Sequence, residues 1–166
     1  MTTIRAVLIA AALVLGSAAH APAVEGQSIR NPSWTLTAAA EALRAGARSW
    51  GYGPALAIRH DFDARWGAEL KIALPAYGPD NGGGGAIEVG ATYTAFEGAT
   101  EFGAMLGPTL FLVGDDSELV GGGIGVVVAA HLTHWLSHGV GLTVGASLRT
   151  GGGIYPAFYG GLAVRF

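Results

Sequence analysis

The stretch from His131 to His138 holds the densest group of side chains in the sequence that could do chemistry. It contains His131, Thr133 and His134, followed by Ser137 and His138. A hydroxyl beside a histidine is the minimum for nucleophilic acyl transfer, because the imidazole can accept the hydroxyl proton. The alternative is a group of polar side chains around a turn, and the elements that carry these residues decide between the two interpretations.

Three further segments have a composition that suggests a site, and each has a simpler interpretation. The acidic run 114–118 could help to bind Ca²⁺, but it lacks the spacing of a dedicated calcium loop. The segment 60–63 (His-Asp-Phe-Asp) offers only two or three metal ligands and fits a turn. The glycine run 82–85 lacks the Lys-Ser/Thr of a phosphate-binding loop. We therefore expect no catalytic, cofactor or metal site in these segments.

Most of the chain after residue 33 alternates between large apolar residues and small or polar ones. A period of two is the mark of β-strands. Eight such segments can be drawn, each of roughly ten residues, which is the length of a tilted strand that crosses a bilayer. They are Trp34–Leu43, Trp50–Phe62, Trp66–Ala76, Ala86–Phe96, Glu101–Val113, Gly123–Trp135, Val140–Thr150 and Pro156–Phe166.

The charges within these segments fall opposite the large apolar residues. A charge that faces lipid at the midplane costs about 2–4 kcal/mol for Arg or Lys, so this pattern predicts a barrel with its apolar face in lipid. Eight strands leave a lumen only wide enough for side chains, and buried charges must be paired. We expect a network of paired charges that plugs the lumen; the alternative is a narrow ion path, with inward glycines leaving room for water. The network would comprise Glu41, Arg59, Glu69, Lys71, Glu88, Glu101, Arg149 and Arg165.

The composition agrees with a membrane protein that has no spanning helix. Hydrophobic residues make up 51% of the chain, charged residues 13%, and the mean hydropathy is +0.43. Residues 6–16 form an apolar run that is too short to span a bilayer and is followed by small residues, the pattern of a secretory signal peptide. We predict a signal peptide over 1–23, cleaved within 19–23, an N-terminal tail over 24–33 and a barrel over 34–166. The net charge of −3 argues against a nucleic-acid partner.

The last segment has a recognisable face. It alternates to Phe166 and resembles the C-terminal targeting strand of Gram-negative outer-membrane barrels, with Phe158, Leu162, Val164 and Phe166 together on the outer face. Aromatic residues also gather near the strand ends, as in the two interfacial girdles of such barrels. The predicted interfacial aromatics are Trp34, Trp50, Tyr52, Trp66, Tyr77, Tyr93 and Trp135.

Together these features resemble the small OmpA-type or OmpX-type outer-membrane proteins. The resemblance covers nearly all of the predicted mature chain, but it is a resemblance of pattern, without a motif diagnostic of one subfamily. It implies an all-β, closed, eight-stranded antiparallel up-and-down barrel in the outer membrane of a Gram-negative bacterium. It also implies contact with lipopolysaccharide and outer-membrane lipids, and assembly by the barrel-insertion machinery. The connections alternate between longer and shorter, which predicts that both termini and the tail over 24–33 are periplasmic.

Three functions follow from this resemblance. The first is a non-enzymatic structural or surface-interaction role in the cell envelope, and the second is a narrow pore. The third is lipid A deacylation, because barrels with that activity use a His-x-Ser pair and a Glu, and His131-Leu-Thr133 is faintly similar. The third is disfavoured because the alternation points His131 inward, at the periplasmic rim. A soluble, lipocalin-like barrel would instead expose the polar face, which carries too few charges for that.

One residue does not fit the predicted strands. Pro108 lies within the fifth segment, where its missing N–H removes a bond from the ladder. The neighbouring Gly107 predicts a β-bulge at this point that absorbs the missing donor.

Overall fold

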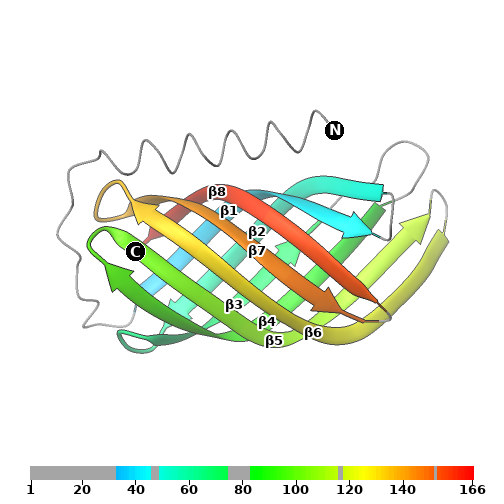
Figure 1. The fold of residues 1–166 in the computed structure, drawn as a ribbon, viewed down its shortest axis with the longest axis horizontal. Helices are drawn as coiled ribbons and strands as arrows, with labels where there is room; N and C mark the ends of the chain where they lie inside the picture. The colour runs from blue at the N-terminus through cyan, green and yellow to red at the C-terminus, as the bar shows by residue number, and fades with distance from the viewer. Residues whose placement is uncertain (1–32, 46–48, 75–82, 116–117, 152) are drawn as a thin grey trace.

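Eight antiparallel strands close into one barrel in the computed structural model, which describes residues 33–45, 49–74, 83–115, 118–151 and 153–166 (Figure 1). Each strand pairs with the next along the chain, and β8 returns to pair with β1. The predicted fold is thereby confirmed. The strands are β1 Ser33–Ala45, β2 Ser49–Asp61, β3 Trp66–Ala73, β4 Gly83–Glu97, β5 Thr100–Asp115, β6 Glu118–Trp135, β7 Val140–Thr150 and β8 Ile154–Arg165.

The barrel closes where β1 meets β8. The two strands pair from Thr35 with Arg165 to Leu43 with Ala157. Beyond that register, Trp34 and Phe166 exchange two backbone hydrogen bonds, both of 3.0 Å. Closure leaves neither strand with a free edge along this seam, which is what a barrel needs in lipid.

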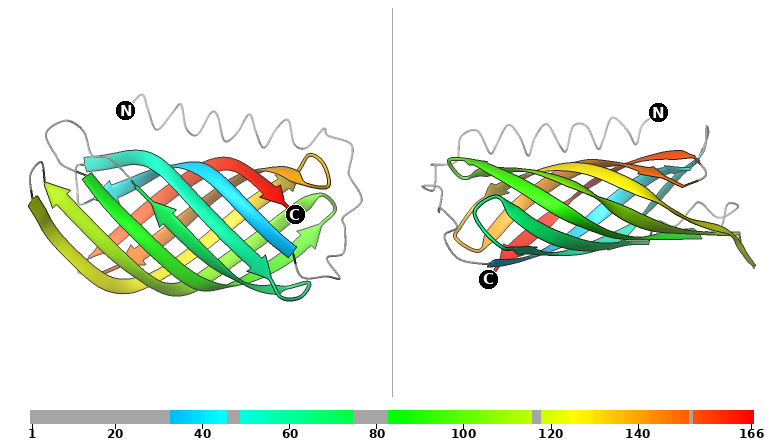
Figure 2. Two further views of the ribbon diagram at one scale, coloured as in Figure 1. Left: turned by 180° about the vertical axis from the view of Figure 1, so that it is seen from behind. Right: turned by 90° about the horizontal axis from the view of Figure 1, so that it is seen from below.

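The strands run obliquely around the barrel, and the two ends differ (Figures 1 and 2). At one end lie the short turns 62–65, 98–99 and 136–139, together with Phe166. At the other end β6 continues beyond β7, because β6 begins at Glu118 but pairs with β7 only from Val127, and β4 and β5 accompany it there, with Gly83 of β4 paired to Gly114 of β5.

Burial alternates along the strands and is inverted relative to a soluble protein. Leu56, Leu106 and Val128 are 51%, 59% and 54% exposed on the outer face, whereas Glu88 and Arg149 are fully buried in the lumen. The soluble alternative requires the reverse arrangement and is wrong. No helix in the described part of the chain is long and apolar enough to cross a membrane.

Pro108 interrupts the sheet without shifting its register. The β4–β5 ladder keeps one offset from Glu88–Thr109 to Ala91–Leu106, and only the pairs between them are missing. The predicted bulge at Gly107 and Pro108 is therefore wrong. Gly107 instead allows close approach of β4, since a Cβ there would lie 1.9 Å from the carbonyl oxygen of Val89. The register shift of β5 occurs farther along, between Val113 and Gly114.

Several predictions fall outside the described residues. The predicted signal peptide and all of the predicted tail except Ser33, which belongs to β1, lie within residues 1–32, and Tyr77 lies in the segment 75–82. The acidic run 114–118 and the glycine run 82–85 are described only in part.

Candidate functional site: the charged lumen

The first group of charges in the lumen, here called the Arg149 cluster, comes from four different strands. It consists of Glu41 on β1, Lys71 on β3, Glu88 on β4 and Arg149 on β7. The Lys71 Nζ atom lies 2.5 Å from Glu41 Oε2 and 3.7 Å from Glu88 Oε2. Arg149 Nη1 lies 2.7 Å from Glu41 Oε1, and Arg149 Nε contacts Glu88 Oε1. The four side chains are at most 4% exposed, so they fill the lumen across its width.

A second group, here called the Glu101 cluster, lies nearer the short turns. It consists of Arg59 and Asp61 on β2, Glu101 on β5 and Arg165 on β8. Arg59 Nε lies 2.9 Å from Asp61 Oδ1, and Arg59 Nη1 lies 2.6 Å from Glu101 Oε1. Arg165 Nη2 lies 2.5 Å from Glu101 Oε2. The indole N–H of Trp135 donates to the same carboxylate oxygen over 3.2 Å.

Each cluster is electrically balanced, with two acids and two bases. This balance has a physical cause, because a buried charge without a partner costs several kcal/mol after desolvation. Since each cluster joins strands on different sides of the barrel, the two together act as cross-braces. They also occupy the lumen at two levels.

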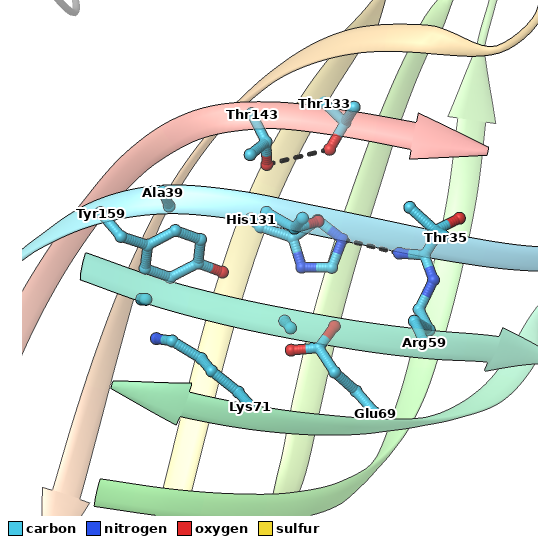
Figure 3. Close-up of a pocket in the computed structure, with 12 residues that line it drawn as sticks. Thr35, Ala39, Arg59, Glu69, Lys71, His131, Thr133, Thr143 and Tyr159 are labelled. Atoms are coloured by element: carbon cyan, nitrogen blue, oxygen red, sulfur yellow. Dashed lines mark hydrogen bonds between the residues drawn. The ribbon is translucent and has the colours of Figure 1, made fainter. Parts of the chain in front are cut away.

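A small polar cavity lies between the clusters (Figure 3). Its volume, counted as the space open to the centre of a water molecule, is about 20 Å³. That is enough for one or two waters. The polar side chains that line the cavity are Thr35, Thr37, Arg59, Glu69, Lys71, His131, Thr133, Thr143 and Tyr159.

The inward glycines make room for rings rather than for a channel. A Cβ at Gly103 would lie 2.1 Å from the imidazole of His131, and one at Gly145 would lie 2.3 Å from the ring of Tyr159. A Cβ at Gly141 would lie 3.0 Å from the indole of Trp135. These three glycines therefore allow large side chains to fill the lumen.

The structure brings together seven of the eight predicted interior charges and separates one. Glu69 faces the cavity. Among the described residues, no nitrogen of a cationic side chain lies within 4.0 Å of its carboxylate oxygens, so it forms no ion pair. Asp61 and His131 belong to the interior and were missing from the predicted network. The signal for Asp61 was present, because β2 continues to this residue and places it on the same face as Arg59.

Trp135 is a correction to the predicted interfacial aromatics. Its side chain is 6% exposed and points into the lumen, where the guanidinium of Arg165 lies 3.9 Å from its ring centroid. The reason is register, since Trp135 shares the inward face of β6 with His131 and Thr133. Trp34, Tyr52, Trp66 and Tyr93 are exposed on the outer face, and Trp50 is half-buried there beside Phe158. The side chains of Phe158, Leu162, Val164 and Phe166 are exposed on the same face.

The residues first considered for acyl transfer do not form a nucleophile–base pair. The Thr133 hydroxyl donates to Thr143 Oγ1 over 3.0 Å. His131 Nε2 lies 3.1 Å from Arg59 Nη1, in a hydrogen bond that the guanidinium donates. Both residues belong to the lumen, away from the lipid face where a lipid substrate would lie.

The segment 60–63 does not converge on a metal either. His60 stacks on Trp34 on the outer face, with ring centroids 4.3 Å apart, whereas Asp61 points inward to Arg59. Asp63 lies in the turn and accepts hydrogen bonds from the backbone N–H groups of Arg65 and Trp66 over 2.7 and 2.8 Å. Among the residues whose placement is described, no three His, Cys, Asp or Glu side chains could hold a metal ion together.

Comparison with known proteins identifies the class of fold. The chain is similar in structure to Neisserial surface protein A, with a TM-score of 0.62 and 14% identity over 81% of this chain and 97% of that one. It is similar to OprG of Pseudomonas aeruginosa (TM-score 0.62, 11% identity, 82% and 97% covered) and to Ail of Yersinia pestis (0.59, 12%, 82% and 99%). The chain therefore has the fold of the small outer-membrane β-barrels. No protein-family model matches it, and no curated protein matches it by sequence.

Proposed function

We propose that this chain is a small integral outer-membrane protein with a closed lumen and a structural or surface-interaction role in the cell envelope of a Gram-negative bacterium. The observation that carries the proposal is the combination of an apolar outer surface with a lumen occupied by two ion-pair clusters. An apolar exterior suits lipid. A lumen crossed by paired charges suits a barrel with a structural role rather than one that conducts solutes.

The difference between the two ends of the barrel supports an orientation. Short turns mark the periplasmic end of outer-membrane barrels. Phe166 lies at the end with the short turns, and the neighbouring Arg165 N–H donates to the carbonyl of Gly139 in one of them over 2.9 Å. We therefore propose that this end is periplasmic, and that the extended ends of β5 and β6 reach outward among lipopolysaccharide. Assembly by the barrel-insertion machinery is part of the same proposal.

A surface-interaction role has support from a neighbour in fold. Ail is the attachment invasion locus protein of Yersinia pestis. A barrel of similar size can thus serve at a bacterial surface. For the present chain, β5 and β6 provide the projecting part on which such a role would depend.

The membrane proposal is tested by expressing the full chain in a Gram-negative host and separating the membrane fractions. We expect the protein in the outer-membrane fraction. We also expect a band that migrates faster on an SDS gel before boiling than after it, as folded outer-membrane barrels commonly do. Recovery in the soluble fraction with no shift on boiling would overturn the proposal.

A narrow pore is the second candidate, and the polar cavity between the clusters favours it. The cavity has space for one or two waters, and its lining includes Arg59 of one cluster and Lys71 of the other. Conduction would require both clusters to part. Lipid A deacylation receives no support from the hydrogen bonds of His131 and Thr133, and unchanged lipid A in the mass spectrum of expressing cells would exclude it.

A further inference from the structure

The seam between β1 and β8 is where the first and last strands of the sheet must meet. Every other ladder joins strands that follow one another in the chain. In Figures 1 and 2 the two strands, β1 in blue and β8 in red, lie side by side. If this seam opened in lipid, the backbone N–H and C=O groups along both strands would lose their partners. The contacts that hold it closed are therefore central to the integrity of the barrel.

The middle of the seam has little side-chain contact of its own. Its central register pairs are Thr37–Ala163, Ala38–Leu162, Ala39–Gly161 and Ala40–Gly160. Leu162 is the one large side chain in these pairs. In the β5–β6 ladder, by contrast, Leu106 pairs with Val128. Cross-strand contacts between side chains stabilise a sheet, so the middle of the seam contributes less to its own stability.

The two backbones also approach each other closely in the seam. A Cβ at Gly161 would lie 2.0 Å from the carbonyl oxygen of Ala38 on β1. Only glycine fits at this position without moving the strands apart. The pairing of β1 with β8 is therefore sensitive to any force that separates the two strands.

Two contacts inside the lumen join strands on opposite sides of this seam. Arg149 on β7 binds Glu41 on β1, with Nη1 2.7 Å from Oε1. The Lys71 Nζ atom on β3 lies 4.2 Å from the centroid of the Tyr159 ring on β8, a cation–π contact in which the side chain reaches toward the ring (Figure 3). Lys71 Nζ also lies 2.5 Å from Glu41 Oε2. Both contacts thus converge on Glu41 and Tyr159, which are register partners across the seam.

The lumen charges are divided unequally between the two halves of the chain. In the two clusters, β1–β4 contribute three acids and two bases, whereas β5–β8 contribute one acid and two bases. Glu69 on β3 adds a further acid to the first half. Among the described residues, the ion pairs that join the halves are Arg59–Glu101, Arg149–Glu41 and Arg149–Glu88. Opposite net charges on the two halves favour their approach when the barrel closes.

We propose that Glu41, Lys71, Arg149 and Tyr159, here called the seam latch, hold the β1–β8 seam closed, and that this seam opens first when the latch is removed. The latch has a more specific role than general bracing, because it acts on one ladder of the eight. It lies next to the centre of the seam, where Ala40 pairs with Gly160. Charged and aromatic groups in the lumen thereby hold a pairing that alanine and glycine side chains support weakly.

The experiment is hydrogen exchange of the backbone amides, measured by NMR on the full, folded protein in lipid nanodiscs. Glu41→Gln removes the carboxylate that both cations of the latch share. We expect amides of residues 37–41 and 159–163 to lose protection about tenfold more than amides of the β5–β6 ladder, because local opening exposes the amides of the opened ladder first. Equal losses of protection in the two ladders would overturn the proposal.

Two further variants calibrate this measurement. Gly161→Ala forces β1 and β8 apart without changing a charge, and it should give the same pattern of exchange as Glu41→Gln. Asp61→Asn is the matched control, because Asp61 is also fully buried but forms its ion pair with Arg59 of the same strand. We expect Asp61→Asn to leave the relative protection of the two ladders unchanged. A selective loss at the seam in this control would contradict the assignment of the latch.

A disulfide across the seam provides an independent measurement, which also applies if Glu41→Gln folds poorly. The chain has no cysteine, and Ala40 and Gly160 are outward register partners at a separation that a disulfide can span. We expect Ala40→Cys with Gly160→Cys to raise the folded fraction of Glu41→Gln toward that of the wild type, measured by the shift on boiling.

The matched disulfide joins β3 to β4, through Ala68→Cys with Ala91→Cys, which are also register partners. It closes a ladder that the latch does not hold, so we expect it to recover little of the folded fraction of Glu41→Gln. Equal recovery from the two disulfides would show that the loss is not located at the seam and would overturn the proposal.

Discussion

At the scale of single residues, two requirements organise the lumen. Buried charged side chains need partners of opposite charge, and large aromatic rings need space. Arg149 joins Glu41 and Glu88 and is fully buried. Tyr159 and His131 fill space that exists because glycines lie beneath them. Charge pairing and ring packing therefore contribute separately to the stability of the barrel, and each contribution can be removed by one substitution.

Arg149→Met tests the charge pairing. The substitution keeps an extended side chain but leaves Glu41 and Glu88 with only Lys71. We expect a loss of about 3–5 kcal/mol in the free energy of unfolding, because breaking a buried pair leaves uncompensated charge. Urea unfolding in micelles measures this loss. Arg65→Met, in an exposed turn, is the matched control and should change stability by less than about 0.5 kcal/mol. Equal effects of the two variants would show that the Arg149 cluster does not brace the barrel.

Gly145→Ala tests the ring packing. Its new methyl group would lie 2.3 Å from the Tyr159 ring, so the ring must move. We expect a destabilisation of about 1–3 kcal/mol from overpacking. Gly160→Ala lies on the neighbouring strand but faces outward, where the nearest atom is 3.7 Å away, and it should be close to neutral. If both substitutions were neutral in the same unfolding assay, the space under Tyr159 would not be filled as described.

At the scale of elements, the turns at the end with Phe166 are held by side-chain caps. Asp63 accepts two backbone N–H groups in the β2–β3 turn, and Ser137 Oγ accepts the N–H of Val140 in the β6–β7 turn. Asp63 is charged and exposed, whereas Ser137 does not titrate. Of these two caps, only the first therefore carries a titratable group.

The two backbone hydrogen bonds hold the pKa of Asp63 below its usual range. A lowered pKa in the folded state means that the carboxylate stabilises the turn at and above the ordinary pKa, and that this contribution is lost as the pH falls through the lowered value. In the wild type, we expect the protection of the Arg65 and Trp66 amides from hydrogen exchange to decrease at that acidic limit. In Asp63→Ala, we expect the protection of these amides to be low at every pH. Exchange at Val140 should not show this dependence. Protection of Trp66 that is the same in Asp63→Ala and in the wild type would contradict the cap.

The elements could largely be predicted from the sequence, and the residues at their ends could not. The alternation placed the outward faces correctly because lipid and lumen select opposite residue types at every second position. Asp61 and Trp135 were misassigned because each lies where a strand meets a turn, and composition there favours rim and turn interpretations. Pro108 was expected to cause a bulge, but the sheet accepts the loss of two ladder pairs without a change of register.

The isolation of Glu69 could not be predicted from the sequence. Its strand position is equivalent to that of the other inward charges. The predicted network also contains equal numbers of acids and bases, four of each. The addition of Asp61 to the interior changes that count. Which acid lacks a partner depends on stagger between strands, which brings Arg59 to Glu101 across the lumen and leaves Glu69 beside the cavity.

At the scale of the whole molecule, the exterior and the lumen make opposite demands on the same strands. Large apolar side chains cover the outside, and among the residues whose burial is described 28 of them, from Trp34 to Phe166, are substantially exposed. In water such a surface would drive aggregation, whereas in a bilayer it is the expected covering. The proposal of an integral membrane protein therefore predicts a strong dependence of stability on where a charge is added.

Leu106→Arg tests that dependence near the middle of β5. We expect a cost of about 2–4 kcal/mol for an arginine at the bilayer midplane, against about 0–1 kcal/mol for Ile154→Arg at the start of β8, near the interface. Both wild-type side chains are exposed, by 59% and 74%, so exposure alone does not separate them. Unfolding from lipid vesicles measures the difference. Equal costs would mean that the two positions do not lie at different depths in lipid.

The closed lumen is tested most directly by planar-bilayer conductance of the purified, folded protein. Two balanced clusters that cross the lumen predict no resolved channel openings in the wild type. Reproducible openings that disappear in Glu69→Gln or Arg149→Met would contradict the closed barrel and identify a pore lined by these charges.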